Sequence, residues 1–230
     1  MRNFFSSITA NSSGIEAGGI PPLALENGRS GEAPPFTARL RRARLGLFVG
    51  LVGIVMVFIS FTSAYIVRQG LPTLDPNTNT LVRDWFSVRL PGLLLLNTIV
   101  LLLSSGSMEL ARRQALRGVE FEREHGVSFL AVTVLLGISF LIGQWTVWQR
   151  LGESGFYLST NPSSSFVYLL TGTHAVHLFG GVLALLFACG ATVFRRPAES
   201  RAVVVDIAAW YWHFMAVLWV YIFCLLKFAR

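Results

Sequence analysis

Three histidines lie inside long apolar stretches of the sequence, where a polar side chain needs a partner or a ligand. His174 and His177 are three residues apart, so in a helix they share one face, and His213 lies on a later stretch. Neutral imidazole is the commonest metal ligand in proteins, and it also binds haem iron. A haem held by two histidines would take one from each stretch, and His177 with His213 is such a pair.

Two other interpretations of the polar residues remain open. One is hydrogen bonding between neighbouring helices, which contributes about 0.6–2 kcal/mol per contact in a membrane. Counting residues from the ends of the stretches puts Asn97, Gln144 and His174 at a similar depth, so they form a candidate polar cluster. The other is contact with lipid headgroups, for which arginines such as Arg195 and tryptophans such as Trp210 stand near the ends of the stretches.

The composition indicates the medium in which these side chains lie. Of the 230 residues, 53% are hydrophobic and 13% are charged, whereas a soluble domain has roughly 25% charged residues. Two cysteines are too few for a disulfide scaffold, and the sequence has no Gly-rich phosphate loop, CxxC motif or nucleophile–base pair. The chain is therefore predicted to be an integral membrane protein.

Five stretches without Asp, Glu, Lys or Arg exceed the ~18 apolar residues that a membrane-spanning helix needs. They cover approximately residues 45–67, 90–108, 126–149, 163–194 and 207–226. Segments of alternating polarity, which are typical of a membrane β-barrel, do not occur. The predicted fold is all-α, a polytopic transmembrane bundle of five helices in residues 44–230 that follows an extended cytoplasmic tail in residues 1–43.

The positions of the lysines and arginines predict the orientation of this bundle. Thirteen lie on the side that holds the N-terminal tail and six lie on the other side. The positive-inside rule therefore puts the N-terminus in the cytoplasm and the C-terminus in the periplasm. The net charge of +7 is then mainly an orientation signal, with anionic lipid headgroups as the general partner, and no nucleic-acid partner is expected.

Ion transport needs groups that these stretches do not contain. Proton pumps and ion-coupled transporters usually carry acidic or basic side chains inside the membrane, and the five apolar stretches have none. Neither a broken helix nor an internal repeat is visible in the sequence. A small transporter stays an alternative hypothesis that no motif supports.

Local strings in all five stretches resemble subunit III of haem–copper oxidases. The last stretch carries AAWYWHF at residues 208–214, similar to the last helix of that family. The string TGTHAVHLFGG at residues 171–181 resembles the family's TGFHGLHVIIG helix, with both histidines in register. LNT at residues 96–98 with LSSG at residues 103–106 matches a third helix. Further matches are Leu136, Gly137, Phe140 and Gln144 in the next helix, and Ala64 and Tyr65 in the first.

The resemblance implies a five-helix bacterial subunit III of a cytochrome c or quinol oxidase in the inner membrane. It implies no redox centre in this chain, because haem and copper belong to subunits I and II, which reduce oxygen and pump protons. Subunit III packs against subunit I, binds phospholipid and supports proton uptake during repeated turnover. The chain would be a non-catalytic part of an oxidoreductase complex, and its tail would suit a larger respiratory supercomplex. The runner-up is a b-type cytochrome with haem on His177 and His213.

Two positions depart from the family's pattern. Ile54 stands where the family often has a membrane-embedded Glu, and Ala216 replaces the Asp of the family's HFVDVVW string. A role of those acids in proton transfer therefore does not carry over to this chain. Their loss also removes two buried carboxylates, which favours a scaffold over a proton conduit.

Overall fold

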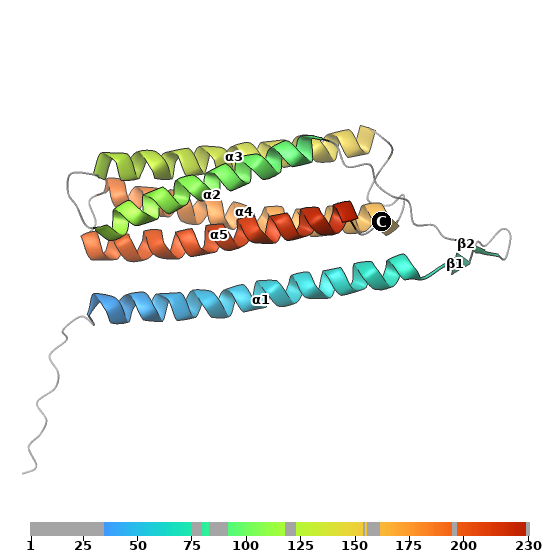
Figure 1. Ribbon diagram of the computed structural model, residues 1–230, viewed down its shortest axis with the longest axis horizontal. Helices are drawn as coiled ribbons and strands as arrows, with labels where there is room; N and C mark the ends of the chain where they lie inside the picture. Colours follow the sequence, from blue (N-terminus) through green and yellow to red (C-terminus); the bar gives the residue numbers. More distant parts are fainter. Residues whose placement is uncertain are drawn as a thin grey trace, which may run out of the picture. The chain divides into compact units, whose positions relative to one another are not determined.

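The structure is a computed structural model that describes residues 35–74, 80–82, 92–117, 123–153, 155, 162–194 and 197–228. Its helices are α1 (Phe36–Gly70), α2 (Leu93–Arg117), α3 (Arg123–Glu153), α4 (Pro162–Val193) and α5 (Ala198–Phe228), which run side by side in Figure 1. All five are long and apolar enough to cross a membrane. The predicted all-α fold with five membrane-spanning helices is thus confirmed.

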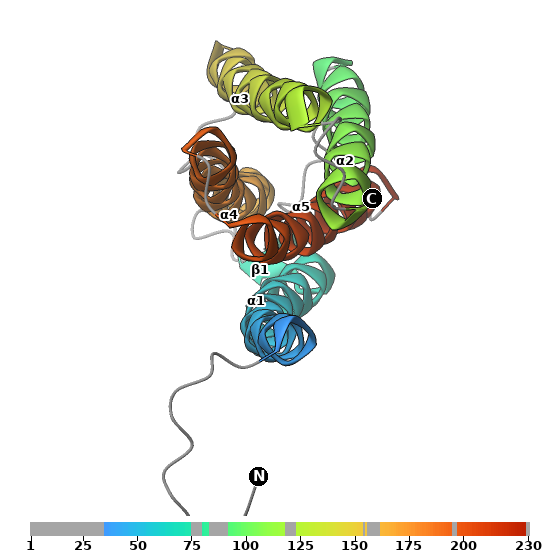
Figure 2. The same cartoon turned by 90° about the vertical axis from the view of Figure 1, so that its left-hand side faces the viewer.

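Four of the helices form a closed ring, and the remaining one lies outside it. In the end-on view of Figure 2, α2, α3, α4 and α5 each pack on the next, and α5 closes the ring on α2. α1 packs on α5 and α4 from outside this ring. Because α1 is the least buried of the five helices, a small number of contacts must hold it in place.

The helices extend beyond the apolar stretches into charged sequence. α1 begins at Phe36, before the predicted span at Leu45, and α5 begins at Ala198, before the predicted span at Ile207. A helix satisfies its backbone hydrogen bonds internally, so it can continue unchanged where the chain leaves the hydrocarbon region. Charged turns of different helices can then meet at the same end of the bundle.

A short antiparallel strand pair follows α1. β1 (Thr73–Leu74) pairs with β2 (Leu81–Val82), with Thr73 opposite Val82 and Leu74 opposite Leu81. The sequence pattern did not predict this pair, because two residues per strand show no periodicity. A pair of this size leaves the helical fold class unchanged.

Two buried tryptophans of α5 bind hydroxyl groups of α2 in the core. The indole N–H of Trp212 donates to the Oγ of Ser104 over 3.1 Å, and that of Trp219 donates to the Oγ1 of Thr98 over 3.0 Å. Ser104 in turn donates to the carbonyl oxygen of Thr133 in α3. A buried indole N–H needs an acceptor, so these bonds fix the register of α5 against α2.

Two glycines allow the ring of Trp212 to lie between α3 and α4. A Cβ atom on Gly137 of α3 would lie 2.7 Å from the Cη2 atom of Trp212. A Cβ atom on Gly181 of α4 would lie 2.9 Å from Cε1 of Tyr211 and 3.2 Å from Cε3 of Trp212. Small residues at such positions permit the close helix approach on which membrane helix packing depends.

This packing predicts that Gly181→Ala destabilises the bundle while Gly180→Ala does not. An added methyl group at Gly181 overlaps Tyr211, and overpacking of a tight core costs about 1–3 kcal/mol. At Gly180 no atom lies within 4 Å of the new Cβ, and Ala favours helix over Gly by ~1 kcal/mol. The midpoint of thermal unfolding of the purified complex checks this prediction, and equal midpoints for the two variants would contradict it.

Candidate functional site

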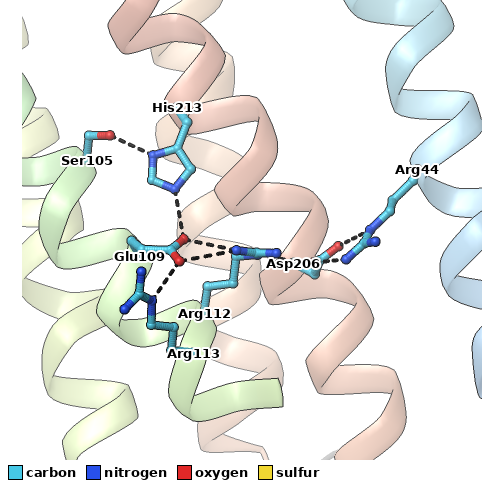
Figure 3. Close-up of polar contacts among 7 residues, drawn as sticks. All are labelled: Arg44, Ser105, Glu109, Arg112, Arg113, Asp206 and His213. Atoms are coloured by element: carbon cyan, nitrogen blue, oxygen red, sulfur yellow. Dashed lines mark hydrogen bonds and ion pairs between the residues drawn. The ribbon is translucent and has the colours of Figure 1, made fainter. Parts of the chain in front are cut away.

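A cluster of charged side chains joins α1, α2 and α5 at the end of the bundle where α1 and α5 begin. We call it the charge cluster. It consists of Arg44, Glu109, Arg112, Arg113, Asp206 and His213, drawn together with Ser105 in Figure 3.

Asp206 of α5 lies at the centre of the charge cluster, and its side chain is completely buried. Arg44 of α1 donates from Nε to Oδ2 over 2.8 Å and from Nη2 to Oδ1 over 2.9 Å. Arg112 of α2 donates from Nε to Oδ1 over 2.8 Å. A buried carboxylate is costly unless it is paired and hydrogen-bonded, and these three bonds meet that requirement.

Glu109 of α2 receives the other contacts of the charge cluster. Arg112 donates from Nη1 to Oε2 over 3.1 Å, and Arg113 donates from Nε to Oε1 over 2.8 Å. The Nε2 atom of His213 lies 3.3 Å from the same Oε2 atom, and its Nδ1 atom lies 2.6 Å from the Oγ of Ser105. A neutral imidazole with its proton on Nε2 fits both contacts, with Ser105 donating to Nδ1.

Arg112 is the residue that makes one network of these contacts. It binds both Asp206 and Glu109, and its guanidinium lies 5.6 Å from the centre of the Trp210 ring. The planar, multidentate guanidinium suits such bridging better than an ammonium group does. The arrangement can therefore hold three helices in one relative position. The carboxylates of Asp206 and Glu109 are both already paired with arginines.

Sequence reasoning did not find the charge cluster, although part of its signal is visible. Glu109 precedes Arg112 and Arg113 by three and four residues, the spacing of ion pairs along a helix. Asp206 and Arg44 each stand immediately before an apolar stretch. That these two residues bind each other depends on α1 packing on α5, which no spacing in the sequence indicates.

Three of the polar residues singled out from the sequence lie near the other end of α5. Asn97, Gln144 and His174 are all buried, on α2, α3 and α4 respectively. Asn97 donates a long hydrogen bond of 3.5 Å to the carbonyl oxygen of Phe140 in α3. The His174 ring lies 5.0 Å from the Trp219 ring and 6.1 Å from the Phe140 ring, measured between centroids.

Gln144 and His174 are exceptional within this group. Neither the side-chain amide of Gln144 nor either ring nitrogen of His174 has a hydrogen-bond partner among the residues that the structure describes. A buried polar group without a partner costs about 1–3 kcal/mol. Gln144 and His174 thus carry four buried polar atoms without a partner among the described residues.

The candidate haem ligands His177 and His213 face different sides of α5. The carbonyl oxygen of His177 accepts a hydrogen bond from the Tyr211 hydroxyl, and the His177 ring lies 6.0 Å from Phe58 of α1. His213 follows Tyr211 by two residues, which is about 200° around a helix, and its ring faces Ser105 of α2. The structure therefore does not bring the two imidazoles to one haem.

Trp210 of α5 borders a groove along α1, whereas Arg195 lies outside the described residues. The groove has a volume of about 440 Å³ and is mostly apolar, with two arginines in its lining. Its lining residues are Thr37, Leu40, Arg41, Arg44, Leu45, Leu47, Phe48, Leu51 and Trp210.

Comparison with known proteins agrees with the local strings. The profile of the family described as cytochrome c oxidase subunit III matches residues 31–229. The chain belongs to the cytochrome c oxidase subunit III family. The resemblance noted in the sequence is thereby confirmed.

Relatives in this family come from algae, bacteria and animals. The chain is 30% identical over 188 residues to cytochrome c oxidase subunit 3 of Prototheca wickerhamii, covering 78% of this chain and 66% of the relative. It is 29% identical over 133 residues to the probable subunit 3 of Mycobacterium leprae, covering 58% and 64%. The subunit 3 of Branchiostoma lanceolatum is 29% identical over 185 residues, covering 78% and 66%. The chain thus spans just under two thirds of the length of these subunit III relatives.

The two departures from the family's pattern lie against the core. Ile54 of α1 packs on it, and Ala216 of α5 is buried within it. Among the described residues, no group of three His, Cys, Asp or Glu side chains could hold a metal ion. Among the residues that the structure describes, Asp206 is a buried acid, and it lies at the end of the bundle.

The charge cluster predicts that Asp206→Ala loosens α1. The change removes both bonds from Arg44 and the bond from Arg112, a loss of about 1–3 kcal/mol because both arginines stay partly accessible to water. Hydrogen–deuterium exchange of the first turns of α1 in the purified complex should become faster. Arg42→Ala, two residues from Arg44 on an exposed face, is the matched control, and unchanged exchange in Asp206→Ala would refute this role.

Proposed function

We propose that the chain is the non-catalytic subunit III of a respiratory haem–copper oxidase, acting as a scaffold, a lipid binder and a stabiliser of proton uptake. Oxygen reduction and proton pumping take place in the partner subunits, which hold haem and copper. The observation that carries this proposal is the subunit III family match, which extends along residues 31–229 and includes all five helices.

The way the helices are joined supports a scaffold. The charge cluster fixes α1 and α2 on α5 at one end, and the Trp212 and Trp219 bonds fix α2 on α5 deeper in the bundle. Large apolar side chains remain exposed along α1, including Phe48, Val49 and Met56. Such an exposed apolar surface suits packing against other membrane helices and lipid. We assign part of it to contact with subunit I.

The proposed setting is the inner membrane of a bacterium, which the chain crosses five times. The excess of arginines on the N-terminal side supports a cytoplasmic N-terminus, which puts the charge cluster at the cytoplasmic end of the bundle. Subunits I and II are the direct partners, and the part of the predicted tail that precedes α1 is assigned to contacts within a larger respiratory supercomplex. Residues 1–34 of this tail lie outside the described residues.

The groove beside Trp210 supports the lipid-binding part of the proposal. Its walls are mostly apolar, and Arg41 and Arg44 lie just before the apolar stretch that begins at Leu45, the level that the orientation puts near the cytoplasmic surface. Arg44 is already paired with Asp206, so Arg41 is the guanidinium available to a further anion. An acyl chain in the groove with a phosphate near Arg41 matches this distribution of polarity.

The scaffold role predicts that removing this subunit leaves the initial rate of oxygen reduction nearly unchanged but shortens the working life of the oxidase. No apolar stretch of this chain supplies a charged relay, so chemistry in the partner subunits should start normally. Oxygen consumption by the purified enzyme, followed until it stops, measures both quantities. The intact complex purified in parallel is the control, and failure of the depleted oxidase to acquire haem and copper would exclude a scaffold-only role.

The groove predicts that Arg41→Ala lowers the amount of anionic phospholipid that stays with the complex several-fold. The substitution removes a cation from the headgroup end and leaves the apolar walls in place. Mass spectrometry of lipids retained after a fixed detergent wash measures the effect. Arg201→Ala on the first turns of α5, away from the groove lining, serves as the matched control, and equal lipid retention in both variants would argue against this site.

A further inference from the structure

Two buried, uncharged polar side chains on the neighbouring helices α3 and α4 lack a hydrogen-bond partner among the described residues. Gln144 of α3 is 1% exposed and His174 of α4 is 0% exposed. The amide nitrogen and oxygen of Gln144 and both ring nitrogens of His174 lack a hydrogen bond to any described residue. Almost all buried polar groups in native proteins are satisfied by protein or by ordered water, so four orphaned atoms indicate a bound group.

The register of α3 and α4 puts these two side chains at the same level. The helices are antiparallel neighbours, and the Nε1 atom of Trp148 donates to the Oγ1 of Thr171 over 3.1 Å. About one turn from that bond, towards the same end of the bundle, lie Gln144 in α3, four residues before Trp148, and His174 in α4, three residues after Thr171. The next turn of α3 carries Phe140, whose ring lies 6.1 Å from the His174 ring. Gln144 therefore lies between Phe140 and Trp148 in α3, and both of these residues contact the segment of α4 from Thr171 to His174.

The neighbouring polar groups are already engaged. The indole N–H of Trp219, beside the His174 ring, donates to Thr98, and the Asn97 amide nitrogen donates to the carbonyl oxygen of Phe140. The Phe140 and Trp219 rings lie against the His174 ring. A direct bond between Gln144 and His174 would satisfy only one atom of each side chain, so a ligand between them would serve more of these four atoms.

We propose that Gln144 and His174 jointly bind at least one internal water molecule between α3 and α4. The pair offers an amide donor, an amide acceptor, one imidazole donor and one imidazole acceptor, and water can act as both donor and acceptor. Buried water typically makes about three hydrogen bonds to otherwise unsatisfied groups, which this set provides. A metal ion fits less well, because no third His, Cys, Asp or Glu joins a group of this kind among the described residues.

The direct test is a structure of the intact oxidase complex at a resolution that shows ordered water. A density peak within hydrogen-bonding distance of both the Gln144 amide and the His174 ring is expected. The peak should be absent in Gln144→Met and in His174→Phe. It should persist in His177→Phe, the matched control, because the Nδ1 atom of His177 lies 2.8 Å from the Thr173 carbonyl oxygen of its own helix. Direct contact between Gln144 and His174 without a peak would overturn the proposal.

Thermal unfolding of the complex gives a second readout. Each single substitution removes the shared water and leaves the remaining buried side chain without a partner, so each should lower the unfolding midpoint by several degrees. The double variant Gln144→Met with His174→Phe removes both polar groups. Its unfolding midpoint should be lowered by less than the sum of the two single-variant decreases. Additive losses would show that the residues do not share a ligand. If neither single variant assembles, the density in the parent complex decides alone.

Discussion

The arrangement of α1, α2 and α5 depends on one fully buried carboxylate. Asp206 can stay charged inside the protein only while Arg44 and Arg112 reach it from two other helices. Since α1 is the least buried helix, moving it away would expose little apolar surface to a medium that is itself apolar. The charged pair, together with the Arg39–Ser200 and Tyr221–Thr62 hydrogen bonds, therefore holds α1 on α5, where hydrophobic burial would hold a helix in a soluble protein.

The rest of the bundle is held by neutral groups that act over short distances. Trp212 and Trp219 donate to hydroxyl groups of α2, and glycines on α3 and α4 allow the Trp212 ring to lie close to both helices. Each tryptophan thus combines a directional bond with a large contact area. Charged pairs at one end and indole–hydroxyl bonds in the core both fix α5. Among the described residues, α5 also reaches α4 through the hydrogen bond from the Tyr211 hydroxyl to the His177 carbonyl oxygen.

The sequence was sufficient for the helices and the family, but insufficient for the interactions between helices. Hydropathy located all five spans because a membrane helix must be apolar for its whole length. The strings around His174 and His213 led to the subunit III family. The Arg44–Asp206 pair escaped prediction because its partners are 162 residues apart and neither lies in an apolar stretch. Depth counting placed Gln144 and His174 at one level, but it could not show that both side chains lack a hydrogen-bond partner among the described residues.

The position of α1 also constrains the order in which the fold can be completed. α1 is the first of the five helices to be synthesised, yet its main neighbour is α5, the last. Until α5 has entered the membrane, the Arg44 side chain has no Asp206 to bind, and α1 has only its contacts with α4, such as that between the Phe58 and His177 rings. The Arg44–Asp206 pair and the closed ring can therefore form only in the final step of insertion, when α5 arrives.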